Sequence, residues 1–152
     1  MKHLLPILLA LLLILTSCHS SAGPKYPAPD PDAENGELAV GIPYGYKTYR
    51  YNGEMSYGLA AKWENRPYGK LTVNFCAMSS NRVSISMTLT DSEDRHMAST
   101  GRLAPGQHIT EIQLTGIPAQ TEEICVTIYG WSESGELLYT VSRYENLIRS
   151  YK

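Results

Sequence analysis

Three cysteines are the side chains in this sequence with the widest range of chemistry. A cysteine thiolate can act as a nucleophile, bind a metal, form a disulfide or carry a lipid, and its surroundings decide which. Cys76 has no second cysteine two or three residues away, which excludes a zinc ribbon there. Cys18 directly follows an apolar run, whereas Cys76 and Cys125 lie in sequence that alternates between polar and apolar residues. Cys18 therefore needs a separate interpretation from the other two.

Cys18 closes an N-terminal apolar segment. The run from Leu4 to Leu15 is broken only by Pro6, and it is shorter than the roughly 20 residues of a membrane-spanning helix. It ends in Leu15-Thr16-Ser17-Cys18, an apolar branched residue and two small residues before the cysteine. This segment resembles the lipobox of bacterial lipoprotein signal peptides. The resemblance implies cleavage after Ser17 and a diacylglyceryl group on the Cys18 sulfur. The alternative is an ordinary secretory signal with a cysteine near its end.

A lipidated Cys18 would hold the protein at the extracytoplasmic face of the cell membrane. Each buried methylene contributes about 0.8 kcal/mol, so two acyl chains anchor stably and the chain itself spans nothing. His19 follows the cysteine in place of aspartate, so no inner-membrane retention signal of the Gram-negative kind is present. We therefore divide the chain into a signal peptide (1–17), a lipidated cysteine with a tether (18–40) and a folded domain (41–152).

The segment that follows Cys18 is rich in proline. Prolines recur among small and acidic residues, without an apolar period, at Pro24, Pro27, Pro29 and Pro31. Proline-rich chains favour extended polyproline II, which rises about 3.1 Å per residue. We expect residues 18–40 to form a disordered tether that holds the domain away from the membrane.

The rest of the chain alternates between apolar and polar residues. The clearest alternation covers Leu71 to Ala77 and Val83 to Leu89, and a period of two with β-branched residues is typical of half-buried strands. Further expected strands cover 46–51, 55–63, 109–114, 124–131 and 137–144, of which the first two are weaker. No long amphipathic helix is apparent. The segments predict an all-β fold, a single antiparallel, immunoglobulin-like β-sandwich.

An order of strands and turns runs from Asn81 to Tyr144. Its elements are Val83 to Leu89, the acidic turn Asp91 to Asp94, Leu103-Ala104-Pro105-Gly106, Ile109 to Leu114, Ile124 to Trp131, and Glu133 to Glu136. The order resembles small β-sandwich modules of Gram-positive surface lipoproteins, which carry a Pro-Gly turn, an I-x-x-I-x-L strand and an acidic-Gly turn. The resemblance covers less than half of the chain, and it implies the fold rather than a function.

Cys76 and Cys125 remain as an even pair in an oxidising compartment. A disulfide between them would close a long loop and add about 2–4 kcal/mol. The alternative is two reduced cysteines that act as small hydrophobic residues in or beside the core. Alternation puts Cys76 on the face opposite Leu71 and Phe75, and it leaves Cys125 outward. A bridge would therefore join neighbouring strands of one sheet, unless a bulge changes the parity.

The remaining polar residues form no catalytic motif. His96 and His108 flank a Pro-Gly turn and would approach each other across a hairpin, but a metal site needs further ligands. The acidic turn Asp91 to Asp94 offers oxygens to calcium, although a solvated turn accounts for it. The net charge of −2 at pH 7 provides no basic field for nucleic acid. We expect no metal, no cofactor and no catalytic residue.

The richest aromatic stretch follows the expected tether. It sets tyrosines beside cations, and its candidate binding residues are Tyr44, Tyr46, Tyr49, Arg50 and Tyr51. Aromatic faces next to cations can stack on sugar rings or contact another protein through an arginine anchor. A tyrosine-rich edge strand is also ordinary β-sheet sequence.

Together these features predict a membrane-anchored extracytoplasmic lipoprotein with a non-catalytic interaction role at the cell envelope. The alternatives are a structural accessory subunit of an envelope machine for secretion or conjugation, and a carbohydrate or cell-wall binding module. An exposed aromatic patch would favour ligand binding. A bare hydrophobic edge strand would favour assembly by strand addition. A deep pocket with converging carboxylates or histidines would favour an enzyme.

Overall fold

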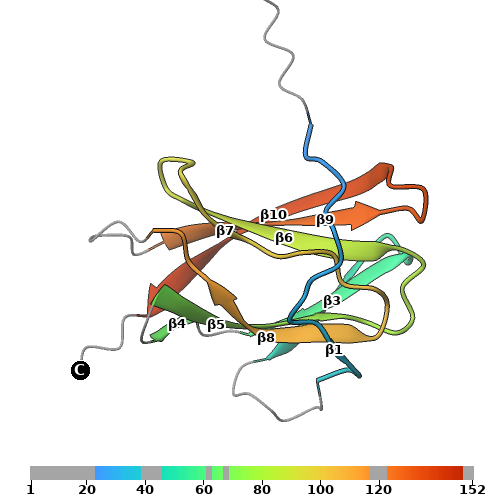
Figure 1. The fold of residues 1–152 in the computed structure, drawn as a ribbon, viewed down its shortest axis with the longest axis horizontal. Coiled ribbons are helices and arrows are strands. Elements are labelled where there is room, and N and C mark those ends of the chain that lie inside the picture. Colours follow the sequence, from blue (N-terminus) through green and yellow to red (C-terminus); the bar gives the residue numbers. More distant parts are fainter. Residues whose placement is uncertain (1–22, 39–45, 61–62, 67–68, 117–122, 149–152) are drawn as a thin grey trace, which may run out of the picture.

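The alternating segments of the sequence fold as strands of two facing sheets (Figure 1). The computed structural model describes residues 23–38, 46–60, 63–66, 69–116 and 123–148. Within these residues no helix has the length and apolar character needed to cross a membrane. The expected all-β antiparallel sandwich is confirmed.

Sheet I forms one layer of the sandwich. It contains β1 (Glu34–Asn35), β2 (Lys47–Tyr51), β3 (Met55–Leu59), β4 (Trp63–Arg66), β5 (Lys70–Ala77) and β8 (Gln107–Gln113). The central strand β5 pairs with β8 on one side and with both β3 and β4 on the other. β1 extends the sheet beyond β8, and β2 extends it beyond β3.

Sheet II forms the facing layer in the strand order β10-β9-β6-β7. Its strands are β6 (Ser84–Asp91), β7 (His96–Ser99), β9 (Glu123–Trp131) and β10 (Leu137–Ile148). All pairs within this sheet are antiparallel. The two sheets are joined where the C-terminal end of β10 pairs in parallel with β4, at Leu147 and Ile148.

The core lies between the sheets and follows the expected parity. Alternate residues of the facing strands are fully buried in one cluster, among them Leu71, Val73, Phe75, Ala77, Ile85, Met87, Leu89, Ile124, Val126 and Ile128. Burying a valine, leucine, isoleucine, methionine or phenylalanine side chain stabilises a fold by about 1.5–3 kcal/mol. Apolar alternation therefore accounts for the packing of sheet I onto sheet II.

The proline-rich segment is not a free tether over its described part. Residues 24–36 lie against the sandwich, crossing from sheet II to the edge of sheet I, where they end in β1 (Figure 1). The Asp30 carboxylate accepts the Gly101 backbone N–H at 2.7 Å, and the backbones of Ala28 and Asp30 bond to that of Arg102. The prediction for 18–40 is thus wrong for residues 24–38, because these backbone groups find partners on the domain. Residues 18–22, 39 and 40 lie outside the described part.

The two internal cysteines are free thiols, so the candidate disulfide is not formed. Cys76 lies on β5 of sheet I and Cys125 lies on β9 of sheet II. Both alternate with core residues, as expected from parity. The prediction of neighbouring strands in one sheet is wrong, because the cysteines belong to the two different layers of the sandwich.

Candidate functional site

The tyrosine-rich strand does not present a single surface. Tyr49 and Tyr51 share one face of sheet I, and Arg50, which lies between them along β2, is on the opposite face. Tyr49 pairs with the core residue Tyr57, and Arg50 is exposed on the other face. Tyr44 lies outside the described residues. The structure therefore divides the candidate binding residues between the outer face of sheet I and the opening between the sheets.

Tyr46 fills a gap on the outer face of sheet I. A methyl group at Gly58 would overlap the hydroxyl end of Tyr46, so the missing side chain of this glycine makes room for the ring. Cys76 pairs with Gly58 across β5 and β3, and it is fully buried beneath this cover. Burial raises the pKa of the Cys76 thiol and, to a greater extent, that of Tyr46. Tyr46 is therefore a packing residue.

Tyr49 belongs to a stacked group that closes the side of the sandwich. Its ring stacks on Tyr57 with centroids 5.2 Å apart, and the Arg143 guanidinium lies 4.0 Å from the Tyr49 ring centroid. Arg143 also forms an ion pair with Glu145 at 2.6 Å. Both charged residues come from β10. This group links the edge of sheet I to the edge of sheet II, and a cation over an aromatic face stabilises such a contact.

Tyr51 lies at the same opening between the sheets, two residues further along β2. Its ring meets that of Tyr139 edge to face at 5.8 Å, and the Tyr139 hydroxyl donates to the Glu54 carboxylate. That hydrogen bond, together with burial, raises the pKa of Tyr139. Tyr51 nevertheless remains 40% exposed. Among the described members of the predicted set, it is the one that keeps a large aromatic surface in solvent.

Strand β10 presents an open edge beside this opening. One side of β10 pairs with β9 along residues 137–146, and the other side meets a partner strand only at Leu147 and Ile148 among the described residues. Two of the exposed large hydrophobic residues, Leu138 at 40% and Tyr144 at 65%, also lie on β10. An unpaired edge displays a row of backbone N–H and C=O groups that can pair with another strand. We call this region, residues 137–146 with Tyr51, the β10 edge.

Sequence reasoning found part of the β10 edge. The alternation of 137–144 predicts the strand, and Tyr51 is among the candidate binding residues. Arg143, Tyr144 and Leu138 were not singled out. Their exposure depends on which side of β10 is left unpaired, and no local pattern carries that information.

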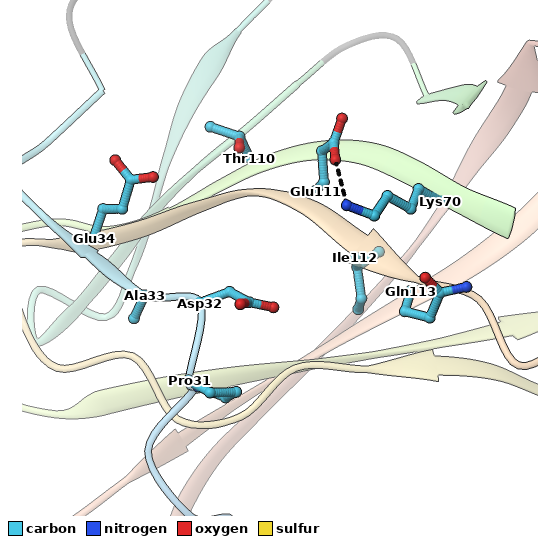
Figure 2. Close-up of a pocket in the computed structure, with 9 residues that line it drawn as sticks. All are labelled: Pro31, Asp32, Ala33, Glu34, Lys70, Thr110, Glu111, Ile112 and Gln113. Atoms are coloured by element: carbon cyan, nitrogen blue, oxygen red, sulfur yellow. Dashed lines mark hydrogen bonds and ion pairs between the residues drawn. The ribbon is translucent and has the colours of Figure 1, made fainter. Parts of the chain in front are cut away.

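A polar groove lies elsewhere, between the N-terminal segment and the outer face of sheet I (Figure 2). Its volume is about 470 Å³, and acidic residues reach it from both sides: Asp32 and Glu34 from the segment, Glu111 from β8. Lys70 of β5 forms an ion pair with Glu111 of the neighbouring strand β8 at 3.2 Å, on the sheet side of the groove, as Figure 2 shows. Both partners of this pair are about half exposed, so the contact contributes little to stability. The groove is wide and open, and its charges are partly neutralised.

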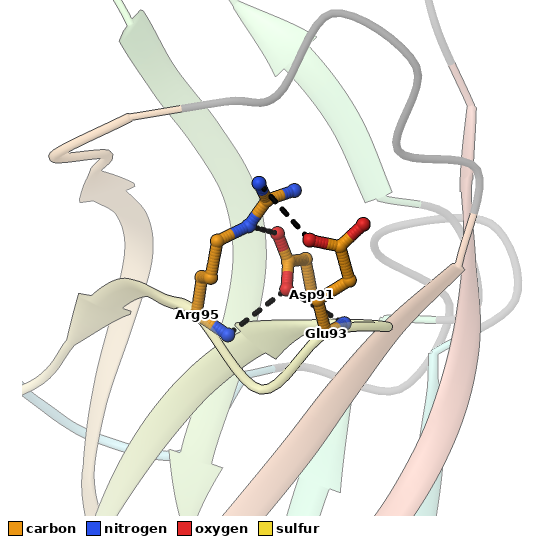
Figure 3. Close-up of polar contacts among 3 residues, drawn as sticks. All are labelled: Asp91, Glu93 and Arg95. Atoms are coloured by element: carbon orange, nitrogen blue, oxygen red, sulfur yellow. Dashed lines mark hydrogen bonds and ion pairs between the residues drawn. The ribbon is translucent and has the colours of Figure 1, made fainter.

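The acidic turn is organised around a buried carboxylate (Figure 3). Asp91 accepts the backbone N–H groups of Glu93 and Arg95, both at 2.9 Å, and the Arg95 side chain at 2.7 Å. Burial raises the pKa of Asp91, but these hydrogen bonds outweigh it and leave the pKa below its ordinary value. Residues 92–95 are exposed, so the turn is solvated as predicted except at Asp91, which is buried and whose carboxylate is used internally.

The two histidines do not approach each other as expected. His96 lies on β7 of sheet II, where its ring bonds to Ser99 at 2.8 Å. His108 lies on β8 of sheet I, where its Nδ1 donates to the Gly36 carbonyl at 2.8 Å. The intervening chain crosses between the sheets and does not form a hairpin. Across the part of the chain that the structure describes, no three His, Cys, Asp or Glu side chains converge as metal ligands.

The chain matches no protein-family model, and no curated protein shows significant sequence similarity to it. The β10 edge is therefore assessed on its own geometry. It combines an unpaired backbone, exposed apolar side chains on the strand itself and an aromatic residue beside it. These groups can bind an extended polypeptide, because backbone pairing supplies affinity and alternate side chains supply specificity.

Proposed function

We propose that this protein is a lipid-anchored, non-catalytic interaction module at the extracytoplasmic face of the cell membrane. Its sandwich contacts another polypeptide by strand addition at the β10 edge. The observation that carries the proposal is the long side of β10 that has no partner strand over residues 137–146 of the described chain. Of the functions expected from the sequence, this feature favours protein assembly.

The side chains at the edge support a protein partner. Leu138 and Tyr144 are exposed on the outer face of sheet II, and Tyr51 is exposed on the inner side of the opening. An added strand would be flanked by apolar surface on both faces, which suits the alternate side chains of an extended peptide. Edge strands normally carry lysines, prolines or bulges that prevent such pairing. Between Thr140 and Asn146 this strand has no lysine and no proline, and its register with β9 is regular; the register shift of the strand lies before this stretch, between Leu137 and Tyr139. The inward-facing charges Arg143 and Glu145 form an ion pair with each other.

The membrane location rests on the N-terminal segment. The lipobox resemblance at Leu15 to Cys18 supports a thioether-linked lipid on Cys18. A Cys18→Ala variant should lose partitioning into the detergent phase of cell extracts. Unchanged partitioning would remove the lipid anchor from the proposal while leaving the edge-binding role in place.

The interaction is tested by crosslinking intact cells and identifying what is joined to the mature protein by mass spectrometry. A Thr140→Lys/Ser142→Lys variant puts two lysines on the exposed side of the open edge, and it should lose the crosslinked products. Lysine blocks an edge because a partner strand would have to bury or displace its charge. The matched control is Ser92→Lys/Thr110→Lys, which changes two exposed residues away from β10.

The proposal would be contradicted if the edge variant kept the same crosslinked products as the control variant. If no protein product forms in either sample, binding of the chain to purified cell wall becomes the next measurement. Loss of cell-wall binding in a Tyr51→Ser variant would then support the carbohydrate function instead.

A further inference from the structure

We infer that the β10 edge pairs with the β10 edge of a second copy of this chain, antiparallel and symmetric about Val141. The inference rests on the proposed strand addition and names its partner. Sheet II would then continue across two molecules. A two-fold interface of this kind requires a surface that is complementary to itself, and β10 meets that requirement in one register.

The symmetric register follows from the alternation of β10. Side chains at 140, 142 and 144 are exposed on the outer face, and those at 139, 141, 143 and 145 face the opening between the sheets. Leu138 lies at the register shift between Leu137 and Tyr139, where it has no partner on β9, and its side chain is exposed. An antiparallel pair must match residues on the same face, so the two-fold axis passes through a residue position. An axis at Val141 sets Thr140 opposite Ser142 of the second copy.

On the outer face this register brings the exposed apolar residues together. Leu138, 40% exposed, lies opposite Tyr144 of the second copy, and Tyr144, 65% exposed, lies opposite Leu138. The two pairs flank the hydroxyl pairs formed by Thr140 and Ser142. The two large apolar side chains that a single molecule leaves in solvent on residues 137–147 of β10 are therefore covered by one contact. Aromatic and aliphatic side chains are a favourable cross-strand combination.

On the inner face the same register avoids like charges. Tyr139 lies opposite Arg143 of the second copy, and Arg143 remains 28% exposed in its side chain although it already contacts Tyr49. A guanidinium beside a tyrosine ring is a favourable pair. Val141 meets its own copy at the axis.

The neighbouring registers lack this match. An axis at Ser142 would set Leu138 against Asn146 and Tyr144 against Thr140, so neither exposed apolar residue would meet another. An axis at Thr140 would set Tyr144 against Glu136, before the start of the strand. The position of the exposed apolar residues therefore selects the axis at Val141.

The symmetric dimer would also allow both copies to be anchored in the same membrane. Antiparallel strands in one sheet are related by an axis normal to that sheet, so the outer faces of sheet II in both copies point the same way. The N-terminal segment lies on that outer face, where Tyr26 packs edge to face on Trp131 at 5.6 Å and Pro24 and Pro27 line a small groove. In one copy the described chain begins beyond the outer side of sheet II (Figure 1), so the described parts of both copies would begin on the same side of the dimer.

Both lipidated cysteines would consequently reach one bilayer. Cys18 precedes Pro24 by six residues, a stretch of chain that spans at most about 20 Å. Confining the two copies to one membrane surface raises their effective concentration, so a pairing that is weak in solution forms readily there.

Sedimentation of the mature chain tests the inference. The protein carries Cys18→Ser, which removes the lipid and leaves every described residue unchanged. It should sediment as a concentration-dependent dimer. Adding Thr140→Lys/Ser142→Lys places lysine opposite lysine twice, and the chain should become monomeric. Adding Thr140→Glu/Ser142→Lys places glutamate opposite lysine twice, and the dimer should return.

The two double variants change the same positions, so they separate pairing from folding. Circular dichroism and melting of both variants confirm that each is folded. A parent chain that stays monomeric up to millimolar concentration would overturn the inference, as would equal association of the two variants.

The cell crosslinking distinguishes this failure from failure of the proposed function. A different protein crosslinked to β10 and lost in the Lys/Lys variant would overturn the second copy and keep strand addition. Crosslinks that are the same in the parent chain and in the two double variants would overturn the pairing of two copies and the proposed strand addition alike.

Discussion

Gly58→Ala is a small change with a large expected effect, because the packing of Tyr46 depends on the absence of a side chain at position 58. The added methyl group would occupy the place of the Tyr46 hydroxyl and would also lie 2.8 Å from the Cε2 atom of that ring. Either Tyr46 leaves the outer face of sheet I or β3 shifts. Both outcomes uncover Cys76, which pairs with Gly58 and is fully buried.

The expected loss in the free energy of unfolding follows from the two possible responses, displacement of Tyr46 or a shift of β3. Expelling a half-buried tyrosine exposes about 100 Å² of ring, which is worth about 2.5 kcal/mol. The Tyr46 hydroxyl is buried without a conventional hydrogen-bond partner among the described residues, and its return to water gives back about 1 kcal/mol. Forcing the sheet to accept the methyl group costs about 1–3 kcal/mol. We therefore expect Gly58→Ala to lower the free energy of unfolding by about 1–3 kcal/mol.

Urea unfolding and thiol alkylation measure the effect. In a Tyr46→Ala background the clash is absent, so Gly58→Ala should be neutral or stabilising by about 0.5–1 kcal/mol, as expected for alanine in a strand. Alkylation of Cys76 should become faster in the single variant. The control is Gly116→Ala, whose new methyl group meets nothing within 4 Å. The reasoning is refuted if Gly58→Ala is as well tolerated as the control, or equally costly in both backgrounds.

Three further outcomes are expected. Asp91→Asn should lower the melting temperature at neutral pH. The native pKa of Asp91 is depressed, so the ionised carboxylate stabilises the fold at pH values above the ordinary carboxyl pKa. The difference in melting temperature between the variant and the parent chain should therefore shrink only below about pH 4. Gly101→Ala would set a methyl group 2.6 Å from the Asp30 backbone nitrogen, so limited proteolysis should cut the N-terminal segment faster than in Gly116→Ala. A thiol reagent should modify half-buried Cys125 in the native protein and buried Cys76 only after unfolding; absence of any adduct after unfolding would show that the two are bonded.

The candidate site was predictable only where its signal was local. The alternation of apolar and polar residues predicted β10 over 137–144, and the tyrosine cluster predicted an aromatic feature at β2. Tyr46 and Tyr49 proved to be packing residues, because Gly58 and Tyr57 on the paired strand β3 accommodate their rings. The sequence shows that tyrosines are clustered, but the neighbouring strand determines whether their rings pack within the domain or remain exposed.

The proline-rich segment illustrates a different limit. Its composition is that of an extended chain, and where the structure describes it the segment is not helical, although it makes a turn at Pro31 and Asp32. Composition gives no sign that Asp30 faces the Gly101 backbone or that Tyr26 reaches Trp131. Both contacts join residues more than 70 positions apart, so only the folded domain brings them together.

By itself the sequence determined the fold class and the parity of its strands, because backbone geometry requires side chains of a half-buried strand to alternate with a period of two. Tertiary structure alone decided which strands are neighbours. It separated Cys76 from Cys125 into opposite sheets, placed His96 and His108 in different layers, and left one side of β10 without a partner over residues 137–146 of the described chain. Strand pairing is decided by the joint burial of surfaces distant in sequence, and no single segment contains that information.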